Sequence, residues 1–146
     1  MKRSYYQVPF DFGKFFEQKE LTKITLRESI SQFISVIITT YFQEYTFDEN
    51  FGSEIWETDF DLLTNPNVLK EQIRNSLQDK ISTYEKRLSN VKVQLYLGED
   101  LSQKVEKVRL KKYLTIKVIG KVIKTDEPYT FSGNYFLAPL SYTTSR

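Results

Sequence analysis

The spacing of hydrophobic positions changes along the chain from a helical period to a strand period. Between Leu26 and Tyr41, apolar residues recur every three or four positions, which places them on one face of a helix. Thr25 followed by Glu28 has the spacing of a capping box and marks the start of this helix. We expect the helix to end near Phe42.

A second helix is predicted after an irregular stretch at residues 43–64. Asn65 can cap its first turn, and Pro66 suits the first helical position, where no amide hydrogen is needed. The apolar stripe then continues to Leu88 at helical spacing. We therefore expect this helix to end at Ser89-Asn90.

Beyond the second helix, apolar and polar positions alternate, which indicates strands with one buried face. We expect strands at Val91–Leu97, Lys107–Val122 and Tyr129–Leu137. Lys112 occupies a core-facing position of the second strand, so a bulge is predicted near Lys111-Lys112. The order of elements predicts an α+β fold, with two helices packed on one face of a small three-stranded antiparallel sheet.

The chain is predicted to have three parts, and its 146 residues suffice for one domain with its own core. Residues 1–24 form an aromatic N-terminal arm that lacks a clear period, is held by its rings and has a short turn at Phe12–Glu17. Residues 25–138 form the α+β domain. Residues 139–146 form a loose C-terminal tail.

Composition narrows the chemistry that the chain can perform. It contains no cysteine and no histidine, which excludes disulfides, thiolate metal sites and a Ser-His-Asp triad. The start of the chain lacks the apolar region of a signal peptide, and no apolar stretch is long enough to span a bilayer. We expect a soluble protein, in which any catalysis would have to use carboxylates, lysine or tyrosine.

Acidic residues without any Lys or Arg gather in the aromatic segment between the two predicted helices, at residues 44–61. A pair such as Glu54 and Glu57 could serve glycoside hydrolysis. A solvated or partner-facing loop explains the same residues, and Phe51-Gly52 favours a fixed turn within it. Its rings could also fold back to cap the open end of the helical layer.

Basic residues dominate residues 104–124. The face of the strand Lys107–Lys121, with an interleaved tyrosine, could neutralise and stack on nucleic acid. A lysine-rich outer face also keeps a long strand soluble, and it could contact another protein. Nucleic-acid binding is therefore the alternative function.

Glu85 and Arg87 lie near the end of the second predicted helix. Two residues apart on a helix, their side chains point to different faces, so they need not pair with each other. They could be surface charges of small energetic value. They could also anchor a partner at a helix–strand corner.

Two stretches of the chain resemble one known family. Asn50-Phe51-Gly52-Ser53-Glu54-Ile55-Trp56 is similar to the Asp/Asn-Phe-Gly-Ser-Gly loop of the baseplate wedge and sheath-initiator proteins of contractile injection systems. Tyr84-Glu85-Lys86-Arg87-Leu88 resembles the family's Tyr-Glu-Pro-Arg-Leu segment. Lys86 replaces the family's proline, and Glu54 replaces the second glycine of its loop.

The resembled family includes the TssE component of type VI secretion and the lysozyme-like baseplate wedge protein of contractile-tail phages. The aromatic arm and the Glu-Ile-Trp-Glu variant look like its type VI branch in Bacteroidetes. The resemblance implies a cytoplasmic structural protein of the baseplate, for which we expect no enzymatic activity, no cofactor and no metal. Such a protein binds other wedge subunits and offers a strand edge to the sheath protein of the first ring.

The resemblance also implies which residues bind these partners. Glu85 and Arg87 are expected to contact wedge subunits, whereas Phe51, Gly52 and Trp56 are expected to shape the partner-binding loop. Neither nucleic acid nor a membrane is an expected partner of such a protein.

Overall fold

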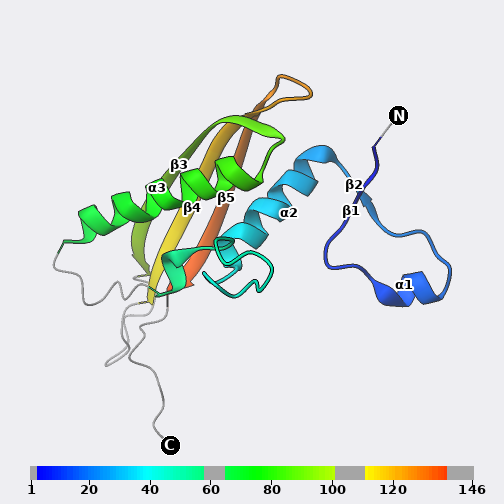
Figure 1. Ribbon diagram of the computed structural model, residues 1–146, viewed down its shortest axis with the longest axis horizontal. Coiled ribbons are helices and arrows are strands. Elements are labelled where there is room, and N and C mark those ends of the chain that lie inside the picture. Colours follow the sequence, from blue (N-terminus) through cyan, green and yellow to red (C-terminus); the bar gives the residue numbers. More distant parts are fainter. Residues whose placement is uncertain (1–2, 58–64, 101–110, 138–146) are drawn as a thin grey trace, which may run out of the picture.

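Two helices and a three-stranded antiparallel sheet form the body of the protein (Figure 1). The computed structural model describes residues 3–57, 65–100 and 111–137. Helices α2 (Leu26–Thr39) and α3 (Pro66–Tyr84) cover one face of the sheet. The sheet has the order β3 (Leu88–Asp100), β4 (Lys111–Val122) and β5 (Pro128–Leu137). The predicted α+β fold is confirmed.

Helix α2 begins at the predicted capping box. The Thr25 hydroxyl accepts a hydrogen bond from the Glu28 backbone N–H at 3.2 Å, and Glu28 Oε2 accepts one from the Thr25 N–H at 2.7 Å. The bond from the Thr25 backbone lowers the pKa of the Glu28 carboxyl. The helix ends at Thr39 rather than near Phe42, because Thr40 is already extended (ψ 130°). β-branched residues at this end weaken helical propensity.

Helix α3 begins where predicted but ends earlier. Asn65 Oδ1 accepts a hydrogen bond from the Val68 N–H at 3.4 Å at the start of the helix. Tyr84 is the last helical residue, because Glu85 leaves the helical conformation (φ −92°, ψ 84°). Leu88, which the helical period had included, instead opens β3 and is buried there.

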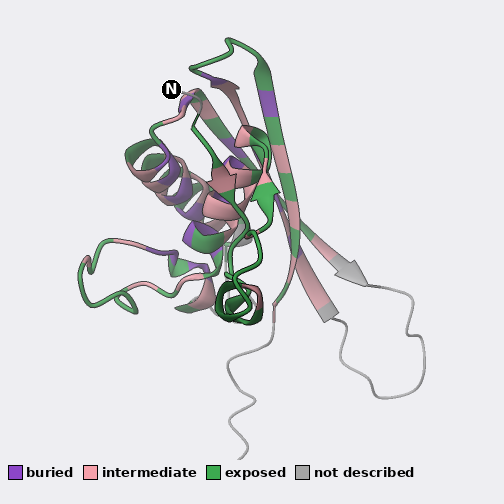
Figure 2. Cartoon of the chain, turned by 90° about the vertical axis from the view of Figure 1, so that its right-hand side faces the viewer, coloured by how far each residue is buried: buried purple, intermediate pink, exposed green. Residues whose placement is uncertain are grey.

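The core lies between the two helices and the inner face of the sheet (Figure 2). Its buried side chains come from one stripe of each helix and from alternate positions of the strands. Among them are Ile30, Ile34, Ile37, Ile38, Ile73, Leu77, Ile81, Val93, Leu95, Leu114, Ile116, Val118 and Val122. Full burial of an aliphatic side chain of this size contributes about 1.5–3 kcal/mol, so this cluster holds the layers together.

The register of the sheet differs from the prediction at one place. No bulge occurs at Lys111-Lys112, where β3 and β4 pair without a break and Lys112 lies opposite Glu99. The irregularity lies instead between Ser89 and Lys92, where Asn90 adopts a φ of 52°. The left-handed region tolerates asparagine better than most residues. Residues 107–110 of the predicted second strand and the predicted tail at 139–146 lie outside the described residues.

The N-terminal arm forms a ribbon of its own. Strand β1 (Tyr5–Tyr6) pairs with β2 (Lys23–Ile24), and the short helix α1 (Phe12–Phe16) lies beyond them, away from the sheet (Figure 1). The Val8 N–H donates to Gln32 Oε1 of α2 at 3.1 Å. The expectation that its rings hold the arm is wrong for its exposed phenylalanines, which are Phe10, Phe12, Phe15 and Phe16.

Replacing Thr25 by alanine removes the side-chain acceptor at the start of α2. We expect the free energy of unfolding to fall by about 1 kcal/mol, as measured by urea denaturation. Thr46→Ala, at an exposed loop position, is the matched control and should leave the free energy nearly unchanged. An equal loss in the two variants would contradict the role of the capping box.

Candidate functional site

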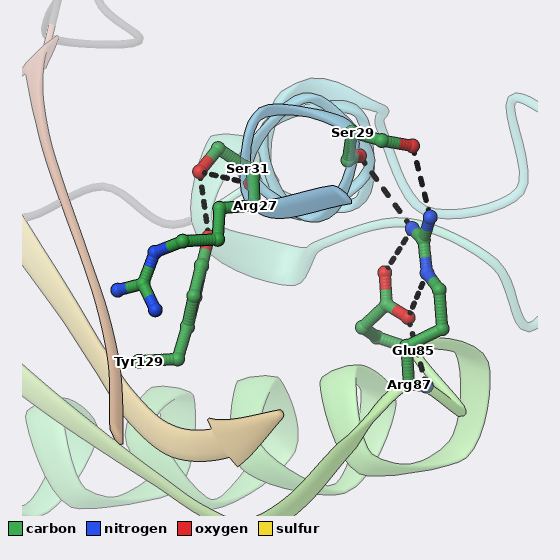
Figure 3. A network of polar contacts seen from close by, with 6 residues as sticks. All are labelled: Arg27, Ser29, Ser31, Glu85, Arg87 and Tyr129. Carbon is green, nitrogen blue, oxygen red and sulfur yellow. Dashed lines mark hydrogen bonds and ion pairs between the residues drawn. The ribbon is translucent and has the colours of Figure 1, made fainter. Parts of the chain in front are cut away.

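The candidate site is the corner where α3 passes into β3. Because α3 ends at Tyr84, Glu85 and Arg87 do not share a helix, and their side chains meet (Figure 3). Arg87 Nε donates to Glu85 Oε1 at 2.7 Å, and Arg87 Nη2 donates to Glu85 Oε2 at 2.5 Å. The expectation that the two residues need not pair was wrong, since it assumed helical geometry for both. This two-point contact is the strongest form of an ion pair between side chains.

The Glu85 carboxylate lies inside the protein. Glu85 is 1% exposed, and its Oε1 also accepts a hydrogen bond from the Arg87 backbone N–H at 3.0 Å. The description as a surface charge pair therefore does not hold for Glu85. The hydrogen bond to Glu85 raises the pKa of the Arg87 guanidinium, which stays charged. A buried carboxylate without this partner would cost several kcal/mol.

Arg87 joins the corner to two other parts of the chain. Its Nη1 donates to the Ser29 hydroxyl on α2 at 2.8 Å. Its Cζ lies 5.9 Å from the centre of the Tyr5 ring on β1, within reach of a cation–π contact. One guanidinium thus links α3, β3, α2 and the arm. Sequence reasoning missed Ser29 and Tyr5, because no spacing along the chain relates them to Arg87.

Helix α2 also holds the start of β5 (Figure 3). Arg27 Nη1 donates to the Pro128 carbonyl at 3.0 Å, and its guanidinium lies 5.4 Å from the centre of the Tyr129 ring. The hydroxyls of Ser31 and Tyr129 are 2.7 Å apart and share a hydrogen bond. Tyr129 is buried, and burial raises the pKa of its hydroxyl. These contacts also left no signal in the sequence.

The loop between α2 and α3 contains the predicted fixed turn at Gly52. The φ of Gly52 is +111°, and a Cβ there would lie 2.6 Å from the Tyr41 carbonyl oxygen. Only glycine fits both restrictions. The next residue, Ser53, is buried, and its N–H donates to the Thr40 carbonyl at 2.8 Å. The turn therefore lies directly against the end of α2.

Phe51 and Trp56 attach the same loop to the body. The Phe51 ring centre lies 5.0 Å from that of Tyr84. Trp56 Nε1 donates to the Ile38 carbonyl at 2.7 Å, and its ring lies 6.0 Å from that of Tyr135. These two rings fold back onto the helical layer, whereas Phe47 is exposed and residue 60 lies outside the described residues.

Two acidic side chains of the loop stabilise the loop itself. Asp48 Oδ2 accepts a hydrogen bond from the Tyr84 hydroxyl at 2.7 Å, which raises the pKa of that hydroxyl. Glu44 Oε2 accepts one from the Tyr41 N–H at 2.8 Å. Glu54 and Glu57, considered above for glycoside hydrolysis, are the two ends of a 3-10 turn.

A side chain of a helix contacts each outer edge of the sheet. Along a strand, successive residues direct their N–H and C=O groups to opposite edges. The Val93 N–H of β3 donates to Gln78 Oε1 of α3 at 3.2 Å, so α3 covers part of the β3 edge. At the β5 edge, the Pro128 carbonyl accepts a hydrogen bond from Arg27 Nη1. Because Pro128 points outward, the alternate residues after it also point outward.

These outward residues of β5 are Thr130, Ser132, Asn134 and Phe136. Among the described strands, β5 pairs only with β4. None of the described backbone hydrogen bonds outside the sheet ladder involves these four residues. Within the described part of the chain, β5 therefore has an open edge at these four residues.

Comparisons with known proteins agree with this geometry. The sequence model of a family described as baseplate wedge protein gp25 matches residues 24–127. A crystal structure of a candidate tail lysozyme from Geobacter sulfurreducens has a similar fold, with a TM-score of 0.57 and 18% sequence identity. The likeness covers 83% of this chain and 99% of that chain, and it concerns the fold alone. A comparison with curated protein sequences finds no significant match.

The described helices were also compared with the requirements of a membrane span. Within residues 3–57, 65–100 and 111–137, no helix combines the length and the apolar character needed to cross a bilayer.

Replacing Gly52 by alanine should destabilise the protein strongly. The variant must accept a positive φ and displace the Tyr41 carbonyl, so we expect a loss of about 2 kcal/mol or more in the free energy of unfolding. Urea denaturation measures this loss. Gly13→Ala is the matched control, since its φ is not positive and its nearest contact is a side-chain atom, Asp11 Oδ1, at 3.2 Å rather than backbone. A loss no larger than that of the control would contradict the assigned role of Gly52.

Replacing Glu85 by glutamine should test the buried ion pair. Neutralising one partner leaves the Arg87 charge without its counterion, and we expect a loss of about 2–4 kcal/mol in the free energy of unfolding. Glu71→Gln removes an exposed ion pair with Arg74 and should have little effect. Equal stability of the Glu85→Gln variant and the native protein in urea denaturation would show that the pair does not hold the corner.

Proposed function

Because the chain belongs to the baseplate wedge protein gp25 family, we propose that it joins wedge subunits and templates the first sheath ring by strand addition at β5. As a member of this family, the chain is a structural protein of a contractile-tail or injection-system baseplate, not an enzyme. The observation that carries the proposal is the open edge of β5, where Thr130, Ser132, Asn134 and Phe136 take part in no described backbone hydrogen bond outside the sheet ladder.

Strand addition at β5 requires backbone groups that an incoming strand can reach. Thr130, Ser132, Asn134 and Phe136 supply them at alternate positions, and their side chains are exposed. An added strand would pair with these groups and extend the antiparallel sheet. Pro128 limits the pairing at one end, since it lacks an N–H and its carbonyl is occupied. Pairing with an added strand would therefore begin at Thr130.

The corner of Glu85 and Arg87 is proposed as a contact to wedge subunits. Glu85 is buried, so it would act by holding Arg87 in place. The Arg87 side chain is 31% exposed and the neighbouring Lys86 is exposed, so both can reach a partner. Phe51, Gly52 and Trp56 would support this contact by fixing the adjacent loop. Their role in binding stays a prediction.

We further propose that the baseplate is of the type VI secretion kind, in the branch found in Bacteroidetes. The aromatic ribbon that precedes the family match at residue 24 supports this assignment. The Glu-Ile-Trp-Glu sequence of the 3-10 turn supports it as well. The presence of type VI sheath, tube and wedge genes beside the gene for this chain would support the assignment.

Nucleic-acid binding, the alternative based on Lys107–Lys121, gains no support from the described residues. Lys121 forms an ion pair with Asp126 at 2.6 Å, which partly neutralises that face. Residues 107–110 lie outside the described part of the chain.

Replacing Ser132 by proline should block strand addition without removing a ladder bond. Proline is tolerated on an edge strand where the N–H faces outward. Proline removes the one docking hydrogen bond of the Ser132 N–H, and its ring obstructs the incoming strand, so binding of the sheath protein should weaken about tenfold or more. Co-purification with the sheath subunit of the same gene cluster measures the effect, and urea denaturation checks the fold. Ser132→Thr, which keeps the N–H, should bind normally, and normal binding by the proline variant would refute docking at β5.

A further inference from the structure

A cleft of about 590 Å³ lies beside the start of β5. The N-terminal ribbon, α2 and the first residues of β5 form its walls, and most of the side chains that line it are polar. These include Lys23, Arg27, Glu28, Ser31, Gln32 and Thr130. The mechanism of strand addition described above does not use this cleft.

The cleft lies at the end of the open β5 edge. Thr130 belongs to both, because it lines the cleft and is the first outward residue of β5 whose N–H has no backbone partner within the described part of the chain. Pairing cannot continue past it, since Pro128 has no N–H and its carbonyl accepts a hydrogen bond from Arg27. The pairing of an added strand would therefore end at Thr130, beside the cleft.

The direction of the sheet determines which end of the added strand arrives there. All neighbouring strands of the sheet are antiparallel, and β5 runs away from the cleft, from Pro128 to Leu137. A strand that extends this antiparallel pattern runs toward the cleft. Its C-terminal end would lie beside Thr130.

Arg27 offers hydrogen-bond donors in the cleft. Its Nη1 binds the Pro128 carbonyl, but within the described part of the chain its Nε and Nη2 have no hydrogen-bond partner. Its side chain is 48% exposed, and its ion pair with Glu127 is long, at 3.9 Å. The Nε and Nη2 donors of one guanidinium match the two oxygens of a carboxylate.

The other charged groups of the cleft favour the same ligand. The Glu28 carboxylate is engaged by the backbone N–H and hydroxyl of Thr25, at 2.7 Å and 2.8 Å. Lys23 adds a second cation, with a side chain that is 55% exposed and an ion pair to Glu20 at 3.6 Å. The lining of the cleft thus carries two cations, Lys23 and Arg27, against the one carboxylate of Glu28.

We infer that this cleft binds a carboxylate at the C-terminal end of the strand that adds to β5, with Arg27 as its bidentate partner. The inference rests on the proposed function, since it requires an added strand. The carboxylate comes from the chain terminus or from an acidic side chain near it. Arg27 would then fix both the direction and the end point of the docked strand.

Three synthetic peptides with the same alternating Thr-Val sequence can test the inference by NMR titration of the ¹⁵N-labelled full chain. One ends in Gln with a free carboxylate, one in Glu amide and one in Gln amide. The amide signals of Thr130, Ser132 and Asn134 report strand pairing, and the Arg27 Nε–H signal reports the carboxylate. We expect at least one carboxylate peptide to shift both sets of signals and to bind about fivefold more tightly than the neutral peptide.

The free-terminus and Glu-amide peptides distinguish the two sources of the carboxylate. Arg27→Gln should remove the difference between the carboxylate peptides and the neutral peptide. Lys92→Gln, at an exposed position of β3, is the charge-matched control and should keep it. If Arg27→Gln does not fold, the Arg27 Nε–H signal of the native chain still tests the site. This signal should shift with a carboxylate peptide and not with the neutral peptide.

Each remaining outcome overturns a defined part of the account. Equal binding of all three peptides, with shifts along β5, would refute the carboxylate site and leave strand addition intact. Shifts at Arg27 without shifts along β5 would refute the link between the cleft and a docked strand. Absence of β5 shifts with every peptide would count against strand addition itself and, with it, the inference.

Discussion

The buried carboxylate of Glu85 is the constraint on which the arrangement of the layers depends. It lies where α3 passes into β3, and it requires a cation beside it because a lone buried charge is costly. Arg87 meets this requirement by donating two side-chain hydrogen bonds to the carboxylate. Its Nη1 donates a further hydrogen bond to the Ser29 hydroxyl of α2. The pair thereby sets the position of α2 relative to the sheet. The Tyr5 ring adds the arm to the same guanidinium.

Helix α2 contacts the starts of both outer strands of the sheet. Ser29 of α2 accepts a hydrogen bond from Arg87 at the start of β3. Ser31 and Arg27 of the same helix bind Tyr129 and the Pro128 carbonyl at the start of β5. On the far side, Gln78 of α3 occupies part of the β3 edge. The β5 edge is thus fixed at its start and open along its length. An assembly protein that templates another strand needs this combination of rigidity and unpaired backbone groups.

The elements that the sequence predicted well depend on local signals. The capping box at Thr25 and the cap at Asn65 satisfy backbone groups within one turn, so their spacing is visible in the chain. The end of α3 was placed too late because Leu88 fits a helical stripe and a strand equally well. The error also hid the Glu85–Arg87 pair, since separation along an assumed helix argued against contact.

The rest of the site depends on contacts between distant residues. Arg87 and Ser29 are 58 positions apart, and Arg27 and Pro128 are 101 apart. A short sequence motif cannot predict contacts over such separations. The bulge predicted at Lys112 was wrong, because Lys111 and Lys112 pair with Asp100 and Glu99 in an unbroken register. By contrast, the two short motifs around Gly52 and Glu85 were sufficient to indicate the family, which the match over residues 24–127 confirms.

Amide hydrogen exchange along β5 tests the central claim most directly, namely that this strand is an open docking edge. It can be measured by NMR for the free chain and for its complex with the sheath subunit of the same gene cluster. The account predicts fast exchange at Thr130, Ser132, Asn134 and Phe136 in the free chain, slow exchange at the residues between them, and protection of all of them in the complex. Slow exchange at these four residues in the free chain, or no added protection in the complex, would contradict it.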